Sequence, residues 1–257
     1  MTHRMQSRLA ALCLVLLFAG SALAQGLYWE STTNTSGGPM GDRTTNSQNY
    51  AMPKMFKIVN APKVMILRLD QEKMYDINTG TKTYSEMTFA EIENYAKKAG
   101  DKMAAFREKI KNMPPDQQKK MEALAAMMPG GAAEKIEVNA TGDTKTVSGF
   151  SCSKYVLKKG GKDFVTLWVT KGVTGFADLQ KDWVEFGQRM AALTNMTGMG
   201  DAYKKIDGFP METDMSMMGT IQTVVTKVEK RSTPLSEFEV PAGYTKTASP
   251  MLEKTGQ

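Results

Sequence analysis

The sequence predicts an α+β protein in which an antiparallel sheet is covered by helices that are apolar on one side only. Short segments rich in β-branched and aromatic residues follow one another at intervals too short for parallel crossovers. Two longer stretches repeat apolar residues at steps of three and four, the period of a helix with one buried face. Strand-forming segments come before, between and after these stretches, so each helix has a sheet face to cover.

The first part of the predicted sheet is a series of six short strands. Gly37-Gly38-Pro39 ends the first strand, and Pro53, Pro62 and the run Asn78-Thr79-Gly80 separate later ones. The expected strands cover residues 27–33, 43–50, 54–59, 63–69, 73–77 and 82–85. Their short connections favour an antiparallel meander.

A helical segment is predicted from residue 89. Thr88-Phe89-Ala90-Glu91 has the pattern of a capping box, in which the threonine and the glutamate satisfy free amides at a helix start. Pro114-Pro115 ends this helix, and Pro115 opens a second helix that continues to Pro129.

The second half repeats the alternation of strands and helix. We expect a helix over about 176–196, whose apolar stripe includes Phe176, Leu179 and Trp183. Strands are expected before the helix at residues 135–138, 145–157 and 164–169, and after it at 203–206, 211–218 and 221–231. The polar tail after about residue 245 is expected to be loose.

Residues 1–24 have the features of a cleavable signal peptide. Arg4 and Arg8 precede the unbroken apolar run Leu9–Ala19, and Ala22-Leu23-Ala24 has the small-x-small pattern of a cleavage site. The apolar run is about half as long as the roughly twenty residues that cross a bilayer. We therefore expect residues 25–257 to form one domain, periplasmic or secreted, without a stable membrane anchor.

Cleavage after Ala24 would also exclude several kinds of chemistry. It removes His3, the single histidine, and Cys13, one of the two cysteines. The exported chain would then have no histidine to serve as a general base or as a metal ligand, and Cys152 would have no disulfide partner. We therefore expect Cys152 to be buried and inert. We also expect that the protein is not an enzyme and that it binds no cofactor. The formal charge is +6, and the basic residues are interleaved with acidic ones along the chain. This pattern favours a solvated surface over a nucleic-acid-binding patch.

Methionine is the most enriched residue type that remains, with 21 in the whole chain. Its flexible thioether suits an irregular core or an adaptable apolar groove. Thioethers also bind Cu(I), so the dense segment 211–218 offers an alternative metal site. The ligands of that alternative would be Met211, Met215, Met217 and Met218.

Three segments resemble an exported bacterial family, the "domain of unknown function 4412". They are residues 149–155 (GFSCSKY), 165–170 (VTLWVT) and 238–244 (FEVPAGY). Members of that family are similar to periplasmic lipoprotein carriers of the LolA and LolB type. This resemblance implies a strongly curved antiparallel sheet, a half-barrel, wrapped around the amphipathic helices, with an apolar cavity between them that accepts acyl chains. It supplies no catalytic residues.

The sequence and the resemblance together suggest a non-catalytic periplasmic binding protein for an apolar ligand, such as a lipid or the acyl chain of a lipoprotein. Residues in the middle of the helical stripes would face the ligand. The expected lining residues are Trp183, Phe186 and Met190 on one helix, and Met103 and Phe106 on the other. A Cu(I)-handling envelope protein and an interaction or structural module without a small ligand remain as alternatives.

We predict that export is accompanied by cleavage after Ala24. N-terminal sequencing of the exported protein should begin Gln25-Gly26-Leu27. A membrane-bound product that retains residues 1–24 would contradict this prediction, together with the exclusions based on the loss of histidine.

Overall fold

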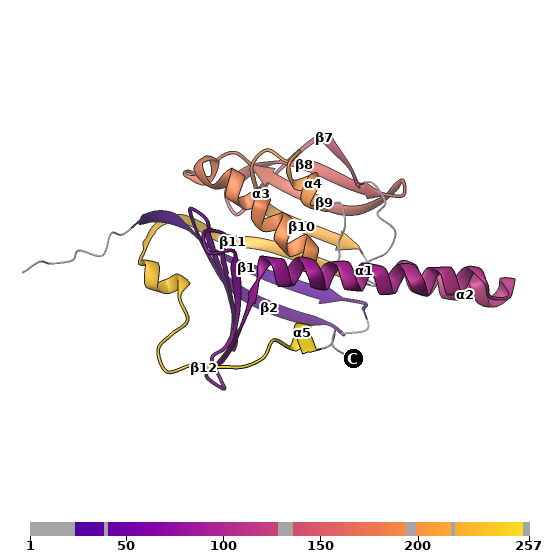
Figure 1. Cartoon of the computed structure of the whole chain (residues 1–257). Coiled ribbons are helices and arrows are strands. Elements are labelled where there is room, and N and C mark those ends of the chain that lie inside the picture. The colour runs from indigo at the N-terminus through magenta and orange to yellow at the C-terminus, as the bar shows by residue number, and fades with distance from the viewer. Residues whose placement is uncertain (1–23, 39–40, 128–135, 194–198, 217–218, 254–257) are drawn as a thin grey trace, which may run out of the picture.

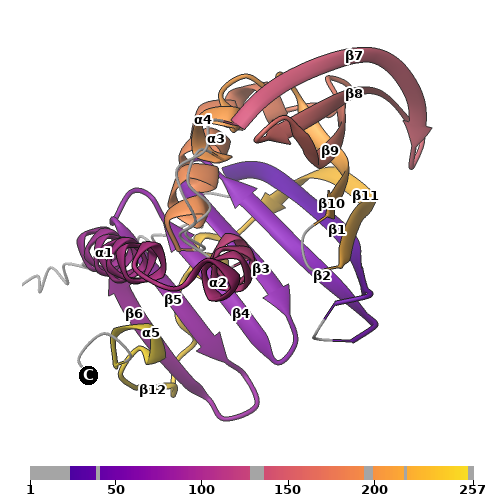
Figure 2. The same ribbon diagram turned by 90° about the vertical axis from the view of Figure 1, so that its right-hand side faces the viewer.

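The computed structural model describes residues 24–38, 41–127, 136–193, 199–216 and 219–253. Within these residues a single sheet of twelve strands has the order β12-β6-β5-β4-β3-β2-β1-β11-β10-β9-β8-β7. The sheet is strongly curved and does not close on itself (Figures 1 and 2). The predicted α+β class with a large, curved, antiparallel sheet is confirmed. The expected signal peptide lies outside the described residues, except for Ala24.

The first six strands form the meander that the turn residues predicted. They are β1 (Ala24–Ser36), β2 (Arg43–Met52), β3 (Met55–Asn60), β4 (Lys63–Arg68), β5 (Lys73–Asn78) and β6 (Thr83–Thr88). Neighbouring strands pair antiparallel in register, for example Trp29 opposite Asn49 and Ser31 opposite Ser47. Because side chains alternate along a strand, these four side chains lie on one face of the sheet.

The second half of the sheet comprises β7 (Ile136–Val147), β8 (Phe150–Lys159), β9 (Lys162–Thr170), β10 (Phe209–Ser216) and β11 (Thr220–Thr233). The long strand β11 pairs with β1, which joins this half to the meander. The single strand expected over residues 145–157 is wrong, because a turn divides it. Ser148 and Gly149 both have positive φ there, at 48° and 85°, which ends β7 and returns the chain as β8.

The three longer helices begin close to where the sequence placed them, and a fourth, short helix was not predicted. They are α1 (Phe89–Lys111), α2 (Pro115–Met127), α3 (Phe176–Leu193) and α4 (Met199–Tyr203). The short helix α4 overturns the expectation of a strand over 203–206. Tyr203 ends this helix, and two turn hydrogen bonds follow, from the amide of Lys205 to the carbonyl of Ala202 and from Ile206 to Tyr203.

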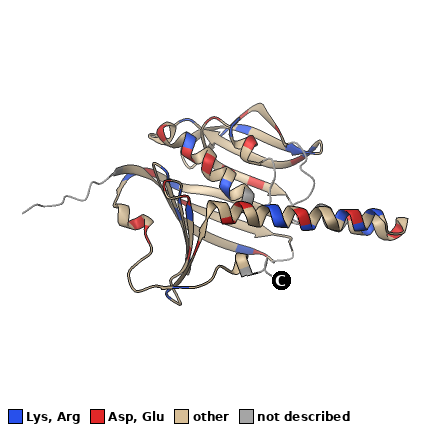
Figure 3. Cartoon of the chain, viewed as in Figure 1, with Lys and Arg blue, Asp and Glu red and all other residues tan. Residues whose placement is uncertain are grey.

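Figure 2 shows α1, α2 and α3 on the same face of the sheet, and Figure 1 shows α1 running past the ends of the strands. No helix in the described part of the chain has the length and apolar character needed to span a membrane. Acidic and basic residues are interspersed along α1 and α2 and over the other elements (Figure 3). This distribution agrees with a solvated outer surface.

The segment after β11 follows the outside of the sheet. The 3₁₀ helix η1 (Leu235–Phe238) buries Phe238 against a cluster on β2–β5 that includes Met52 and Ile66. Beyond residue 245, where the sequence predicts a loose tail, β12 (Thr245–Lys246) pairs parallel to β6 and α5 (Pro250–Glu253) follows. The amides of Thr245 and Thr247 donate to carbonyls of β6 and its preceding turn.

We predict that the capping box at α1 contributes to stability. The Thr88 hydroxyl accepts from the Glu91 amide at 3.2 Å, and the Glu91 carboxylate accepts from the Thr88 amide at 2.7 Å. Thr88→Ala should lower the free energy of unfolding by about 1 kcal/mol, since one amide at the helix start loses its partner. Thr88→Ser keeps the acceptor oxygen and is the control. Equal denaturant midpoints for the alanine variant and the wild type would contradict this assignment.

Candidate ligand-binding clefts

Helix α3 is fixed to the sheet by a cluster of aromatic rings centred on Trp183. The Trp183 ring centroid lies 5.6–6.2 Å from five other rings, mostly in edge or tilted orientations, as aromatic pairs prefer. Three of these rings belong to sheet strands and two to α3 itself: Trp29, Phe56, Phe209, Phe176 and Phe186. Trp183 is only partly buried, so one side of this cluster remains accessible.

Polar contacts set the position of α3 more closely. The buried Asp182 accepts a 2.7 Å hydrogen bond from the backbone amide of Lys54, in the β2–β3 turn. At the other end, Arg189 forms an ion pair with Glu93 of α1, and its guanidinium lies 4.3 Å from the centre of the Phe89 ring. Together these contacts hold α3 between the sheet and α1.

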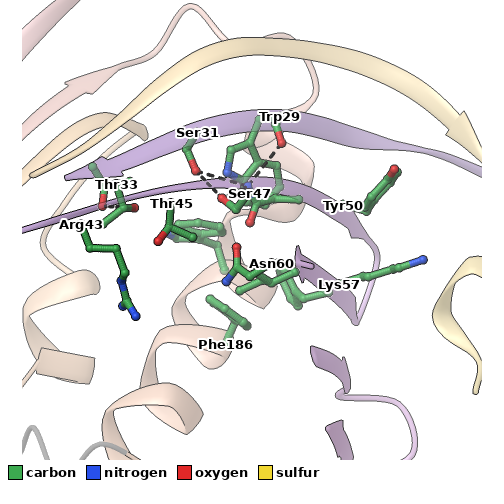
Figure 4. Close-up of a pocket in the computed structure, with 15 residues that line it drawn as sticks. Trp29, Ser31, Thr33, Arg43, Thr45, Ser47, Tyr50, Lys57, Asn60 and Phe186 are labelled. Atoms are coloured by element: carbon green, nitrogen blue, oxygen red, sulfur yellow. Dashed lines mark hydrogen bonds between the residues drawn. The ribbon is translucent and has the colours of Figure 1, made fainter. Parts of the chain in front are cut away.

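Two clefts open beside the accessible side of the cluster. The first has a volume of about 380 Å³ and lies between α3 and strands β1, β2, β3 and β11 (Figure 4). One part of its wall is aromatic, formed by Trp29, Phe56, Trp183 and Phe186. Ile58 adds an aliphatic side chain, and the rest is mainly small polar residues on the strands: Ser31, Thr33, Thr45, Ser47, Asn49, Asn60 and Thr223.

The polar wall of the first cleft is partly satisfied by its own hydrogen bonds. The hydroxyls of Ser31 and Ser47 are 2.7 Å apart, and those of Thr33 and Thr223 are 2.9 Å apart. The Asn49 amide donates to the Ser47 hydroxyl at 3.1 Å. These bonds, two across neighbouring strands and one along β2, order the wall and use part of its capacity for binding a polar ligand.

The second cleft is smaller, about 170 Å³, and lies between α3, α4 and β10. Trp183 and Phe186 line it as well, so the two clefts meet at these side chains. The remaining lining residues are Gly187, Met190, Ala191, Met199, Tyr203 and Met215. None of them carries a charge at neutral pH, since the one ionisable side chain among them, the Tyr203 phenol, is protonated there and desolvation raises its pKa further.

Two glycines allow α4 to approach α3 at the second cleft. A Cβ on Gly187 would lie 2.8 Å from the Tyr203 ring, and a Cβ on Gly200 would lie 2.7 Å from Cγ of Gln188. Both distances are below normal van der Waals contact, so any larger residue would push the helices apart. The chain therefore needs glycine at both positions to form this wall.

Three of the five residues expected to line a cavity do line the clefts. Trp183 and Phe186 contribute to both clefts, and Met190 contributes to the second. Met103 is buried and Phe106 is half-buried on α1, but neither is among the lining residues of the two clefts. The stripe of α1 continues along a helix that passes the ends of the strands (Figure 1).

Two of the four methionines proposed as Cu(I) ligands are described by the structure, and they pack in different clusters. Met211 is fully buried in the cluster that contains Phe209, whereas Met215 packs against a second cluster that contains Leu167. Met217 and Met218 lie outside the described residues. Among the residues that are described, no three His, Cys, Asp or Glu side chains form a group able to hold a metal ion.

Sequence reasoning missed the polar wall and the α4 side of the second cleft. Alternation of Trp29, Ser31 and Thr33 along β1, and of Thr45, Ser47 and Asn49 along β2, was the available signal for the wall. Met199 and Tyr203 gave no such signal, because their role depends on the packing of a five-residue helix.

The chain belongs to the family described as "Domain of unknown function (DUF4412)", whose model matches residues 113–244, more than half of the chain. This confirms the family resemblance drawn from the sequence. No curated protein matches the chain.

A comparison with solved structures found matches of low similarity. PNGF-II, solved in C2 and P2₁ crystal forms, has 10% sequence identity and a TM-score of 0.37. The match covers 90% of this chain but only 33% of PNGF-II, so the chain spans about a third of that protein. A LolA superfamily protein, NE2245 from Nitrosomonas europaea, has 5% identity and a TM-score of 0.32, covering 85% of this chain and 91% of that one. At this distance neither structure assigns a ligand or an activity.

We predict that Cys152 is chemically inert in the folded protein. Its side chain is 1% exposed, its thiol lies 3.4 Å from the Phe150 carbonyl oxygen, and burial raises the pKa of the thiol. A thiol reagent at pH 7 should label it slowly in the native state and rapidly in denaturant. Fast stoichiometric labelling of the native protein would contradict this prediction.

Proposed function

We propose that the protein is a non-catalytic binding protein for an apolar ligand, a lipid or an acyl chain, held between the curved sheet and its helices. The main support is that Trp183 and Phe186 line both clefts. An apolar ligand placed against these two side chains would contact the first and the second cleft together. Its burial would contribute roughly 25 cal/mol for each Å² of apolar surface removed from water.

The composition of the second cleft supports an apolar ligand of variable shape. Met190, Met199 and Met215 bring three unbranched thioether side chains to one small space. Such side chains change rotamer at low cost and adapt to a chain without a fixed conformation. The first cleft alone has a volume near the lower end of the range for small-molecule sites, about 300–1,000 Å³.

The proposed function is compatible with an exported carrier. The N-terminal segment is expected to direct export, and a lipid or the acyl chain of a lipoprotein is a ligand that needs shielding from water in that compartment. Binding of this kind requires no general base, nucleophile or metal ion. The Cu(I) and interaction-module alternatives are therefore outcomes that the binding experiment distinguishes.

We predict that Phe186→Asp weakens binding of a fluorescent fatty-acid probe by about tenfold or more, because it puts a carboxylate where both clefts meet. Val184→Asp adds the same charge to α3 at a half-buried position that lines neither cleft, and is the matched control. Titration of the folded variants with the probe gives the comparison, with folding checked by thermal denaturation.

Met190→Glu provides a second test if Phe186→Asp does not fold. It changes a half-buried residue that lines the second cleft only. A wild-type protein without saturable uptake of acyl probes would refute the proposed function. Native mass spectrometry of protein from its exporting cell would then show bound copper or a bare chain, and so separate the two alternatives.

A further inference from the structure

We propose that the two clefts form one site for a single-chain amphiphile with an anionic head, with the head at Arg43 and the chain directed toward Met190, Met199 and Met215. This inference rests on the proposed function and adds the charge and the orientation of the ligand. It follows from the distribution of charge along the two clefts.

Arg43 supplies the charge at one end of the site. Fifteen residues line the first cleft, and none of them is an aspartate or a glutamate. Two of them are basic, Arg43 and Lys57. Lys57 is directed away from Phe186 in Figure 4 and forms an ion pair with Glu237 of η1. Arg43 is therefore the cation available to a ligand in this cleft.

Arg43 has no competing carboxylate partner in the described part of the chain. It is exposed at the start of β2 and forms no ion pair there. In Figure 4 its side chain extends from β2 toward the side where Phe186 lies, and Thr45 is next along the same strand face. A guanidinium offers up to five N–H donors to a carboxylate or a phosphate, in a geometry that permits two parallel hydrogen bonds.

The distance between the two ends suits an extended chain. Asn49 is paired with Trp29 at the aromatic end of the cleft, and Arg43 is six residues away along β2. At roughly 3.3 Å per residue this separation is about 20 Å along the strand. The second cleft begins at Trp183 and Phe186 and has no charged lining residue. With its head at Arg43, an apolar chain that reaches the second cleft therefore meets no charged lining residue there.

The hydrogen bonds of the polar wall favour an anion over a neutral polar ligand. Ser31 is paired with Ser47, and Thr33 with Thr223, before any ligand binds. A sugar would have to compete with these bonds, whereas an anionic head uses the guanidinium, which has no carboxylate partner there. The part of the ligand next to its head then covers the polar wall. The hydroxyls of the wall keep their own hydrogen bonds, which compensate for the loss of water.

The test measures competition with the fluorescent fatty-acid probe by three single-chain ligands of equal chain length: a fatty acid, a lysophospholipid with a phosphate monoester head, and the neutral fatty amide. We expect the anionic ligands to bind the wild type more tightly than the amide, with a preference that decreases as salt is added. Arg43→Ala should weaken binding of an anionic ligand by about tenfold and leave the amide unchanged. The fatty acid and the phosphate ligand distinguish a carboxylate from a phosphate head.

Lys181→Ala is the matched control, since it removes an exposed cation of α3 that lines neither cleft. Arg43→Lys should retain part of the preference for anions. Equal binding of neutral and anionic ligands, or an equal loss of both in Arg43→Ala, would overturn this inference and leave the proposed function intact. Absence of binding by all three ligands would overturn both.

Discussion

The packing of Trp183 against rings from three different strands and from its own helix is the interaction on which the site depends. It fixes α3 at one height above the sheet, and the buried Asp182 adds a hydrogen bond to the β2–β3 turn. Because Trp183 remains partly accessible, the contact that holds α3 also forms the junction of the two clefts. A change that moved α3 would therefore alter both clefts together, so a loss of packing at this helix would also disturb the proposed binding site.

The α4 side of the site depends on a steric constraint rather than on attraction. Gly187 and Gly200 leave no Cβ where α3 and α4 meet, which lets the Tyr203 ring pack against α3. Met199 and Met215 then face the remaining space from α4 and β10. The backbones of α3 and α4 are therefore close together, while the methionine side chains can adapt to a ligand. This combination keeps the cleft in place while leaving its detailed shape adjustable.

The parts of the fold that depend on local chemistry were predictable from the sequence. Thr88 and Glu91 placed the start of α1, and glycine, proline and asparagine placed the turns of the meander. The turn at Ser148-Gly149 was missed because a β-type pattern continues on both sides of it. The stripe of α3 identified Trp183, Phe186 and Met190, but the equally regular stripe of α1 gave no cleft-lining residue. Periodicity identifies the buried face of a helix, whereas the tertiary structure decides whether a sheet, another helix or a cleft faces it.

In the proposed site, the apolar groups would supply most of the affinity for the ligand, and the charged group would set the orientation of the ligand. The aromatic junction and the methionine-lined cleft present apolar surface that any hydrocarbon chain would bury, so they discriminate weakly between ligands. A single exposed cation contributes less to binding than this burial, and salt screens it. However, Arg43 is at one end only, and the other end has no charge. A reversed anionic amphiphile would place its head among uncharged side chains and its chain beside a guanidinium. The head would then lose its ion pair, and the chain would lose apolar surroundings. For the proposed ligand, this asymmetry of charge favours one binding direction, even where the affinity comes mainly from hydrophobic burial.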